Sequence, residues 1–137
     1  MFRIVAEPIV PADLERVVRA GDGGVVTFLG IVRGRAHDGA AVRSLWYEAY
    51  EAMALAEFER IEAEARERFG DVRLAIVHRV GEVAVGEISV AVLAAAAHRA
   101  EAFLACRYAI DELKLRAAIW KQERYAAGGA AWSETHG

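Results

Sequence analysis

The chain has 137 residues, a formal net charge of −3, and a hydrophobic content of 55%. This length predicts one domain spanning residues 1–137, and the composition is that of an ordered soluble protein rather than a disordered chain. The acidic balance argues against a nucleic-acid partner, because a domain this small that binds DNA or RNA normally carries a basic surplus.

A strand and a short helix are predicted first. Residues 2–6 have the apolar character of a short strand. Pro11 followed by Asp13 is typical of the start of a helix, and this helix carries an apolar side made of Leu14, Val17 and Val18. The glycine-rich residues 21–24 then end the helix.

Two β-rich stretches follow along the chain. Residues 25–32 and residues 42–50 are both rich in β-branched and aromatic side chains, which predicts two strands. The polar, glycine-containing residues 34–40 between them predict a loop. We therefore expect the two strands to form a hairpin.

Two long helices are predicted, with strands between them. Apolar residues recur every three or four positions in residues 51–69, which predicts a helix with one buried face. Residues 72–80 and 87–93 predict strands around a turn at residues 81–86. A second helix begins near Ala97, and its expected buried stripe consists of Phe103, Cys106, Ile110 and Leu113.

The last part of the chain predicts a return to strand structure. Residues 119–121 favour a strand, and Gly128 with Gly129 favours a final turn before Trp132. Strands connected mostly by hairpins and mixed with helices indicate an α+β fold. We expect a mostly antiparallel sheet with two long helices and one short N-terminal helix.

The conventional site types lack their motifs. No nucleotide-binding glycine loop occurs, which argues against a nucleotide-binding regulatory domain. No nucleophile elbow surrounds a serine, whether Ser44, Ser89 or Ser133. Neither a metal nor another cofactor is predicted, because metal-ligand spacing is absent around the histidines His37, His78, His98 and His136.

A cytoplasmic location is predicted from three absences. The single cysteine, Cys106, excludes an internal disulfide, and its position on an apolar helix face predicts a buried core residue rather than a reactive thiol. The N-terminus lacks the apolar core of a secretory signal. The most apolar stretch, residues 88–97, is well short of the roughly 20 residues that a membrane helix needs, so no membrane span is expected.

A group of cations is the remaining candidate for chemistry. His98 and Arg99 fall at the predicted start of a helix, where the macrodipole disfavours a cation. A bound phosphate would explain them, and so would simple exposure to solvent. Lys114 suits the last turn of a helix, whereas Lys121 follows two apolar residues, where partial desolvation would make it a candidate general acid or base. Arg33, at the end of a predicted strand, completes a possible anion site.

Seven sequence stretches, in their order and spacing, resemble the large, catalytic subunit of molybdopterin synthase. The resemblance covers nearly the whole chain. The stretches are GVVTFLGIVR (24–33), YEAY (47–50), HRVG (78–81), VGE (85–87), AHRAEAF (97–103), IDELK (110–114) and IWKQE (119–123).

The resemblance implies a fold, an assembly and a reaction. The fold is α/β hammerhead-like, and the assembly is a homodimer with a small ubiquitin-like partner subunit at each end, giving a heterotetramer. The partner's C-terminal Gly-Gly tail carries a thiocarboxylate. This tail hands sulfur to cyclic pyranopterin monophosphate in two rounds, which forms the dithiolene of molybdopterin.

Carried over by position, the resemblance implies that Lys114 and Lys121 are catalytic. The division of roles between them is open, as is the question whether His98 and Arg99 act across the dimer interface. An alternative is a non-catalytic anion-binding adaptor of the same fold, and the retention of both lysines argues against it. The implied substrate pocket consists of Ile31, Val32, Arg33, His98, Arg99, Lys114, Lys121, Gln122 and Glu123.

Overall fold

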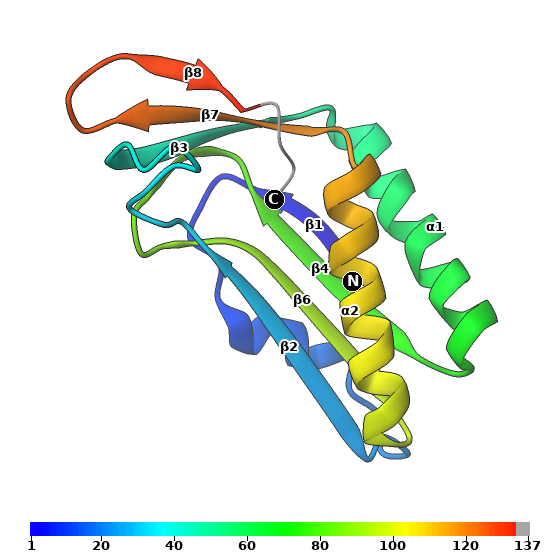
Figure 1. Ribbon diagram of the computed structural model, residues 1–137. Coiled ribbons are helices and arrows are strands. Elements are labelled where there is room, and N and C mark those ends of the chain that lie inside the picture. Colours follow the sequence, from blue (N-terminus) through cyan, green and yellow to red (C-terminus); the bar gives the residue numbers. More distant parts are fainter. Residues whose placement is uncertain (134–137) are drawn as a thin grey trace.

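Two four-stranded sheets and three helices make up the computed structural model, which describes residues 1–133 (Figure 1). The larger sheet has the order β1 (Phe2–Val5), β4 (Arg73–Arg79), β6 (Ile88–Ala96) and β2 (Gly24–Ile31). The smaller sheet has the order β5 (Gly81–Ala84), β3 (Val42–Ala49), β7 (Ile119–Tyr125) and β8 (Ala130–Trp132). The helices are the 3₁₀ helix η1 (Pro11–Val17), α1 (Glu51–Phe69) and α2 (Arg99–Arg116). Among these strand pairs β1 with β4 is parallel and the others are antiparallel, which confirms the α+β prediction.

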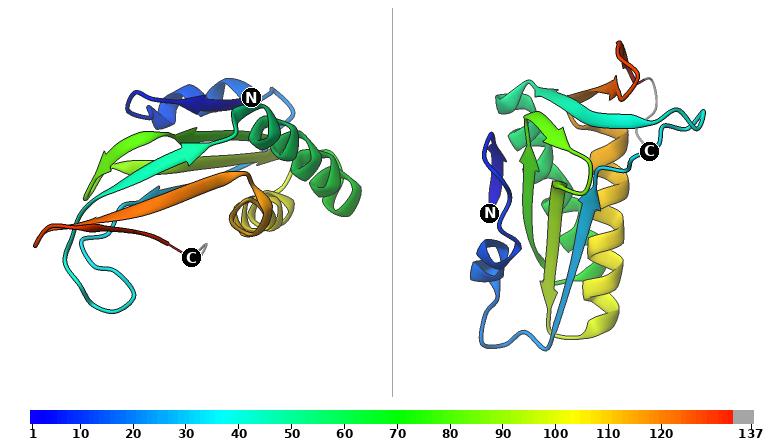
Figure 2. Two further views of the ribbon diagram at one scale, coloured as in Figure 1. Left: turned by 90° about the horizontal axis from the view of Figure 1, so that it is seen from above. Right: turned by 90° about the vertical axis from the view of Figure 1, so that its left-hand side faces the viewer.

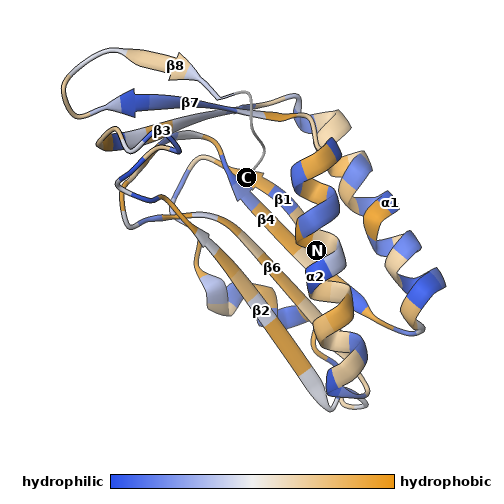
Figure 3. Cartoon of the chain, viewed as in Figure 1, coloured by the Kyte–Doolittle hydropathy of each residue, from blue (hydrophilic) through white to orange (hydrophobic). Residues whose placement is uncertain are grey.

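Both faces of the larger sheet are covered. The helices α1 and α2 pack on one face and η1 packs on the other (Figure 2). Side chains alternate along β4, so that Leu74 and Ile76 face the long helices while Ala75 and Val77 face η1. Central strands buried on both faces are apolar along their length, and the hydrophobic colour dominates the strands of this sheet in Figure 3.

Helix α1 has the bounds that the sequence predicts. Phe58, Ile61 and Ala65 are fully buried on one face, as the periodicity requires. Gly70 ends the helix at φ 91°, a left-handed conformation that glycine adopts without steric cost. Its N–H donates to the carbonyl oxygen of Arg66 and so satisfies a carbonyl in the last turn.

The predicted hairpin between residues 25–32 and residues 42–50 is wrong. β2 pairs with β6 in the larger sheet, while β3 pairs with β5 and β7 in the smaller one. The connecting residues 32–41 cross between the sheets and contain one isolated bridge, between Arg35 and Ala41. Short loops of about two to five residues favour a hairpin, and this connection is longer.

Two strand predictions are also corrected. Residues 81–86, expected to be a turn, contain strand β5, which pairs with β3. The strand expected over residues 87–93 extends through three alanines to Ala96. Alanine has a low strand propensity, but Ala94 packs toward the long helices and Ala95 toward η1, where only small side chains are needed between close elements.

The first helix is shorter and tighter than expected. It is a 3₁₀ helix that ends at Val17, and the next residue, Val18, is 38% exposed. A 3₁₀ helix is normally only one or two turns long, because its hydrogen-bond geometry is poor, so this helix depends on contacts with the rest of the chain. Arg73 supplies this attachment, because its Nε donates to the carbonyl oxygen of Val17 and its Nη2 forms a buried ion pair with Asp22.

Helix α2 starts at Arg99 with His98 as its N-cap, close to the predicted position. Its predicted buried stripe is wrong at Phe103, which is 61% exposed, and right at Cys106, which is buried. Adjacent helical residues are rotated by about 100°, so the neighbouring alanine faces the sheet instead. The buried positions are Ala102, Ala105, Cys106, Ala109, Ile110 and Leu113.

A close approach between β2 and α2 leads to a first prediction. A Cβ atom on Gly24 would lie 2.9 Å from the Cα of Arg99, closer than real Cβ contacts. We expect Gly24→Ala to lower the free energy of unfolding by about 1–3 kcal/mol, as measured in urea, because backbone must move. Gly21→Ala is the control: a Cβ there meets nothing within 4 Å, and its expected effect is below about 0.5 kcal/mol. Equal effects of the two changes would contradict this packing argument.

Candidate active site

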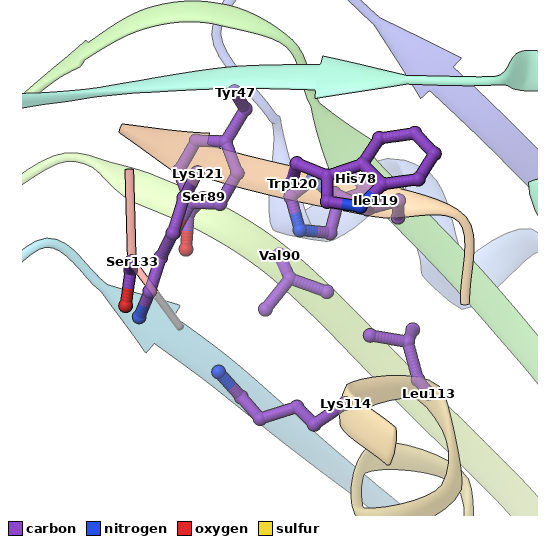
Figure 4. A pocket seen from close by; sticks show the side chains of 10 residues that line it. All are labelled: Tyr47, His78, Ser89, Val90, Leu113, Lys114, Ile119, Trp120, Lys121 and Ser133. Atoms are coloured by element: carbon purple, nitrogen blue, oxygen red, sulfur yellow. The ribbon is translucent and has the colours of Figure 1, made fainter. Parts of the chain in front are cut away.

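Two lysines meet where the smaller sheet lies beside the end of α2. Lys114 is in the last turn of α2, and Lys121 is in β7. The helix stops at Ala117, whose N–H donates to the carbonyl oxygen of Leu113, and the chain then turns back as β7. Lys121 is paired with Tyr47 on β3, so these two side chains lie on the same face of the sheet. Figure 4 shows both lysine side chains directed toward one recess.

The recess adjoins a larger cavity. It has a volume of about 60 Å³, and the cavity beside it has a volume of about 330 Å³. Both are lined by Tyr47, Ser89, Lys114 and Lys121, so they are parts of one site. The larger volume lies within the range of roughly 300–1,000 Å³ that is usual for small-molecule sites. The larger cavity also extends to Ile31, Arg33, Arg35, His37 and Glu123.

The site has an excess of positive charge in a partly desolvated place. Burial lowers the pKa of Lys114, and among residues 1–133 no acidic side chain forms an ion pair with it. Burial also lowers the pKa of Lys121, and the charges of Lys114 and Arg33 lower it further while Glu123 opposes them. Such a cluster attracts anions.

The choice of lysine at these two positions is informative. The chain has 17 lysine and arginine residues, and Lys114 and Lys121 are the only lysines among them. Arginine stays protonated in proteins, whereas a partly buried lysine can lose its proton. Both lysines of the chain therefore lie in this site, where burial makes loss of the proton easier than in water.

Neutral polar groups form the inner wall. Tyr47, His78 and Ser89 are all buried. Ser89 Oγ donates to the carbonyl oxygen of Gly30 at 3.2 Å, and the Tyr47 hydroxyl is hydrogen-bonded with Ser89. Burial lowers the pKa of His78 to about 4, and the charge of Lys114 contributes to this shift. His78 is therefore neutral at physiological pH.

Sequence comparison supplies the identity of the family. Residues 4–116 match the family described as MoaE protein. The chain belongs to the MoaE family. The match includes Arg33 and Lys114 and ends before Lys121, which lies in a part of the chain that individual relatives cover.

Individual members of the MoaE family are similar to this chain over most of their length. The chain is 46% identical over 127 residues to the molybdopterin synthase catalytic subunit of Nostoc sp. (strain PCC 7120), covering 89% of this chain and 76% of that protein. It is 48% identical over 107 residues to the molybdopterin synthase catalytic subunit of Pyrococcus abyssi, covering 78% and 72%. Among solved structures, molybdopterin synthase from Staphylococcus aureus superposes with a TM-score of 0.89 at 34% identity, covering 95% of this chain and 94% of that one.

The MoaE fold brings together some of the residues predicted from sequence and separates others. Ile31, Arg33, Lys114, Lys121 and Glu123 all line the site. Two others do not line it: Val32 is buried beside Val83, and Gln122 alternates to the opposite face of β7, where it accepts a hydrogen bond from Arg124.

His98 and Arg99 lie at the other end of α2. The fifteen helical steps from Arg99 to Lys114 correspond to about 22 Å along the helix axis. His98 lines a separate cavity of about 340 Å³ together with Arg19, Asp22 and Glu101. Within one chain, this pair and the lysines therefore cannot contact the same small molecule.

Sequence reasoning missed the inner wall of the site. Ser89 was considered only as a nucleophile and His78 only as a metal ligand. The available signal was a histidine within a strongly apolar strand, where a polar side chain needs a hydrogen-bonding partner. Within residues 1–133 no three His, Cys, Asp or Glu side chains form a metal-binding group; His136 lies outside the described residues. No helix in this part of the chain is long and apolar enough to cross a membrane.

The coupling between the lysines leads to a second prediction. We expect Lys114→Gln to raise the pKa of Lys121, because a neighbouring positive charge disfavours the ammonium form. The measurement is a side-chain NMR titration of isotopically labelled lysine, which is simple in a chain with two lysines. Arg33→Gln should produce a smaller rise, since the charge of Arg33 is the weaker influence. A pKa of Lys121 that stays constant or falls in Lys114→Gln would refute the coupling.

Proposed function

We propose that this chain is the catalytic subunit of a molybdopterin synthase and acts as a sulfurtransferase. It transfers sulfur from the thiocarboxylated C-terminus of a small ubiquitin-like partner to cyclic pyranopterin monophosphate, forming the dithiolene of molybdopterin. The observation that carries this proposal is the pair Lys114 and Lys121 beside Arg33 in one cavity of a MoaE family member. The relatives are named catalytic subunits, which implies that their enzyme has a second subunit, and this supports a partner subunit for the present chain.

The charge of the site suits the two reactants. A phosphate ester and a thiocarboxylate are both anions, and their repulsion opposes their meeting. At an effective dielectric constant near 20, a pair of unit charges about 4 Å apart interacts with roughly 4 kcal/mol, so several convergent cations can offset that repulsion. The cavity of about 330 Å³ accommodates a pterin-sized ligand.

In this proposal the arginines and His98 bind substrate, and the two lysines have separate roles. Arg33, with His98 and Arg99, binds the phosphate of the substrate. Lys114 binds the partner's tail near the reacting centre. Lys121 transfers a proton or stabilises the charged intermediate, since burial and the neighbouring charge of Lys114 bring its pKa down toward the range useful for acid and base catalysis.

A homodimer would bring His98 and Arg99 to the lysines. β2 is an edge strand of the larger sheet, with one side open to pairing, and it carries the exposed apolar side chains Val25 and Leu29. Beside it, α2 exposes Phe103. These features favour self-association.

Two-fold pairing along β2 would be antiparallel. It would set the Gly24 end of one copy beside the Ile31 end of the other. Gly24 lies next to Arg99, and Ile31 lines the lysine site, so each site would combine residues of two subunits. We therefore propose a homodimer with shared sites, and a partner subunit for each site, which makes a heterotetramer. We further propose that the chain works in the cytoplasm as a single domain.

The third prediction tests the catalytic roles. Lys114→Ala and Lys121→Ala should each lower synthase activity by roughly a hundredfold or more without unfolding the protein. Activity is measured as molybdopterin formed from cyclic pyranopterin monophosphate and thiocarboxylated partner. Lys121→Arg keeps the charge and cannot exchange the proton, so it should remain inactive if Lys121 transfers a proton. Arg60→Ala, which removes an exposed charge on α1, is the control and should be fully active.

Near-normal turnover by either lysine-to-alanine variant would remove that lysine from the mechanism. An inactive wild-type protein that still binds the partner would favour the alternative, a non-catalytic adaptor.

The fourth prediction tests the shared site. Arg99→Ala and Lys114→Ala copies are each expected to be impaired alone. Mixed dimers of the two should regain activity, because one of their two sites has every residue intact. The mixture is made by joint refolding, with separately refolded variants as the control. Failure of mixed dimers to regain activity would contradict contributions from both subunits.

The fifth prediction concerns the lone cysteine. Burial raises the pKa of Cys106 to about 11, and its Sγ lies 3.6 Å from the carbonyl oxygen of Val92 in the core. The thiolate that sulfur transfer requires is therefore disfavoured. Cys106→Ala should keep its activity and lose about 1 kcal/mol of stability. Sulfane sulfur on Cys106 during turnover, detected by mass spectrometry, would make the cysteine a carrier.

A further inference from the structure

His78 is a buried polar side chain that the proposed chemistry leaves unused. It lies near the end of β4, is 5% exposed, and follows the apolar residues Ile76 and Val77. Its ring stands edge-on to Tyr47, with the ring centroids 4.9 Å apart. Burying a polar ring is costly unless its nitrogens are used. The position of this histidine therefore needs a reason beyond packing.

One ring nitrogen has a defined role. Nδ1 lies 2.8 Å from the carbonyl oxygen of Arg79. A carbonyl oxygen only accepts hydrogen bonds, so Nδ1 carries the proton and donates. In the neutral imidazole, Nε2 is then the nitrogen with the free lone pair. The hydrogen bond to the backbone thus selects the tautomer of His78 in which Nε2 can accept a hydrogen bond.

The segment that holds His78 is itself held in place. Arg79 pairs with Glu87 at 3.4 Å, and Glu87 accepts a hydrogen bond from the backbone N–H of Ala84 at 2.8 Å. These contacts join the end of β4 to the turn after β5. The carbonyl oxygen that accepts the hydrogen bond from Nδ1 therefore lies at the end of β4, which these contacts hold in place, and this favours one orientation of the ring.

Besides His78, the neutral side chains of the recess that can accept a hydrogen bond are the hydroxyl groups of Tyr47, Ser89 and Ser133. His78 borders it together with Lys114 and Lys121, whose ammonium groups can only donate. The hydroxyl groups of Tyr47 and Ser89 are already hydrogen-bonded to each other, and Ser89 donates onward to Gly30. In Figure 4 the imidazole projects into the space that Tyr47 and Lys114 also border.

We propose that His78 is a substrate-contacting residue, whose Nε2 accepts a hydrogen bond from an N–H or O–H group of the pterin. The inference rests on the proposed function. Arg33, His98 and Arg99 bind the phosphate and Lys114 binds the partner's tail, whereas His78 binds a neutral donor on the ring system. A volume of about 60 Å³ holds one edge of such a ring rather than the whole of it. The contact would fix which edge of the pterin enters the recess.

Two substitutions separate this role from a structural one. The amide nitrogen of His78→Asn can still donate to the carbonyl of Arg79, but nothing replaces Nε2. The amide oxygen of His78→Gln reaches the place of Nε2, at the expense of the bond to Arg79. A structural role predicts that Asn is the better replacement, whereas substrate contact predicts that Gln is.

The experiment measures binding of cyclic pyranopterin monophosphate by titration calorimetry and then turnover with the thiocarboxylated partner. We expect His78→Asn to weaken binding roughly tenfold, the usual effect of losing one such hydrogen bond, and to raise KM more than it lowers kcat. His78→Gln should recover part of the affinity. Circular dichroism and thermal melting serve as controls for folding.

A measurement on the wild-type protein avoids any dependence on folding of the variants. In protein with ¹⁵N-labelled histidine, the His78 Nε2 resonance should move on addition of the pterin monophosphate, and inorganic phosphate alone should leave it in place. Unchanged affinity in His78→Asn, or an Nε2 resonance unmoved by the bound pterin, would overturn the inference while the proposed function stands. A wild-type protein that does not bind the pterin would overturn both.

Discussion

The partial removal of two lysine ammonium groups from water is the constraint on which this site depends. Lys114 and Lys121 come from different elements, and both have a pKa lowered first of all by burial. A charge held in such a place destabilises the folded chain unless an anion joins it. The surrounding framework must therefore hold both side chains against a tendency to move out into water.

Two sets of contacts provide that framework. At the end of α2, Arg116 pairs with Glu57 at 2.7 Å, with Glu64 at 2.7 Å and with Glu112 at 3.2 Å, which fastens the helix turn that carries Lys114 to α1. On the other side, β7 is paired with β3 along its length, which orients Lys121. A side chain positioned by regular, paired elements is placed more accurately than one on a free loop.

The sequence predicts much of this fold because most of its elements are local. The bounds of α1 follow from a periodic apolar pattern and a terminal glycine, and both lysines fall on the predicted helix end and strand. The hairpin failed because strand partners are chosen over long sequence distances: β2 finds β6 some sixty residues away. The role proposed for His78 could not be predicted from the sequence for the same reason, because its neighbours Tyr47 and Lys114 come from distant parts of the chain.

The central claim is that the partly buried charge of Lys114 lowers the stability of the folded chain and serves to bind an anion. Urea unfolding at neutral pH tests it. The pKa of Lys114 is lower in the folded chain, so its ammonium destabilises the fold at every pH below the ordinary lysine pKa of about 10.4. Lys114→Met, of similar length and without charge, should therefore unfold at a higher urea concentration than wild type. A peptide that ends in the partner's thiocarboxylated Gly-Gly tail should stabilise the wild type, by about 2.7 kcal/mol at a hundred times its Kd, and stabilise the variant much less. A variant that is less stable than wild type, or that the tail peptide stabilises equally, would contradict the account.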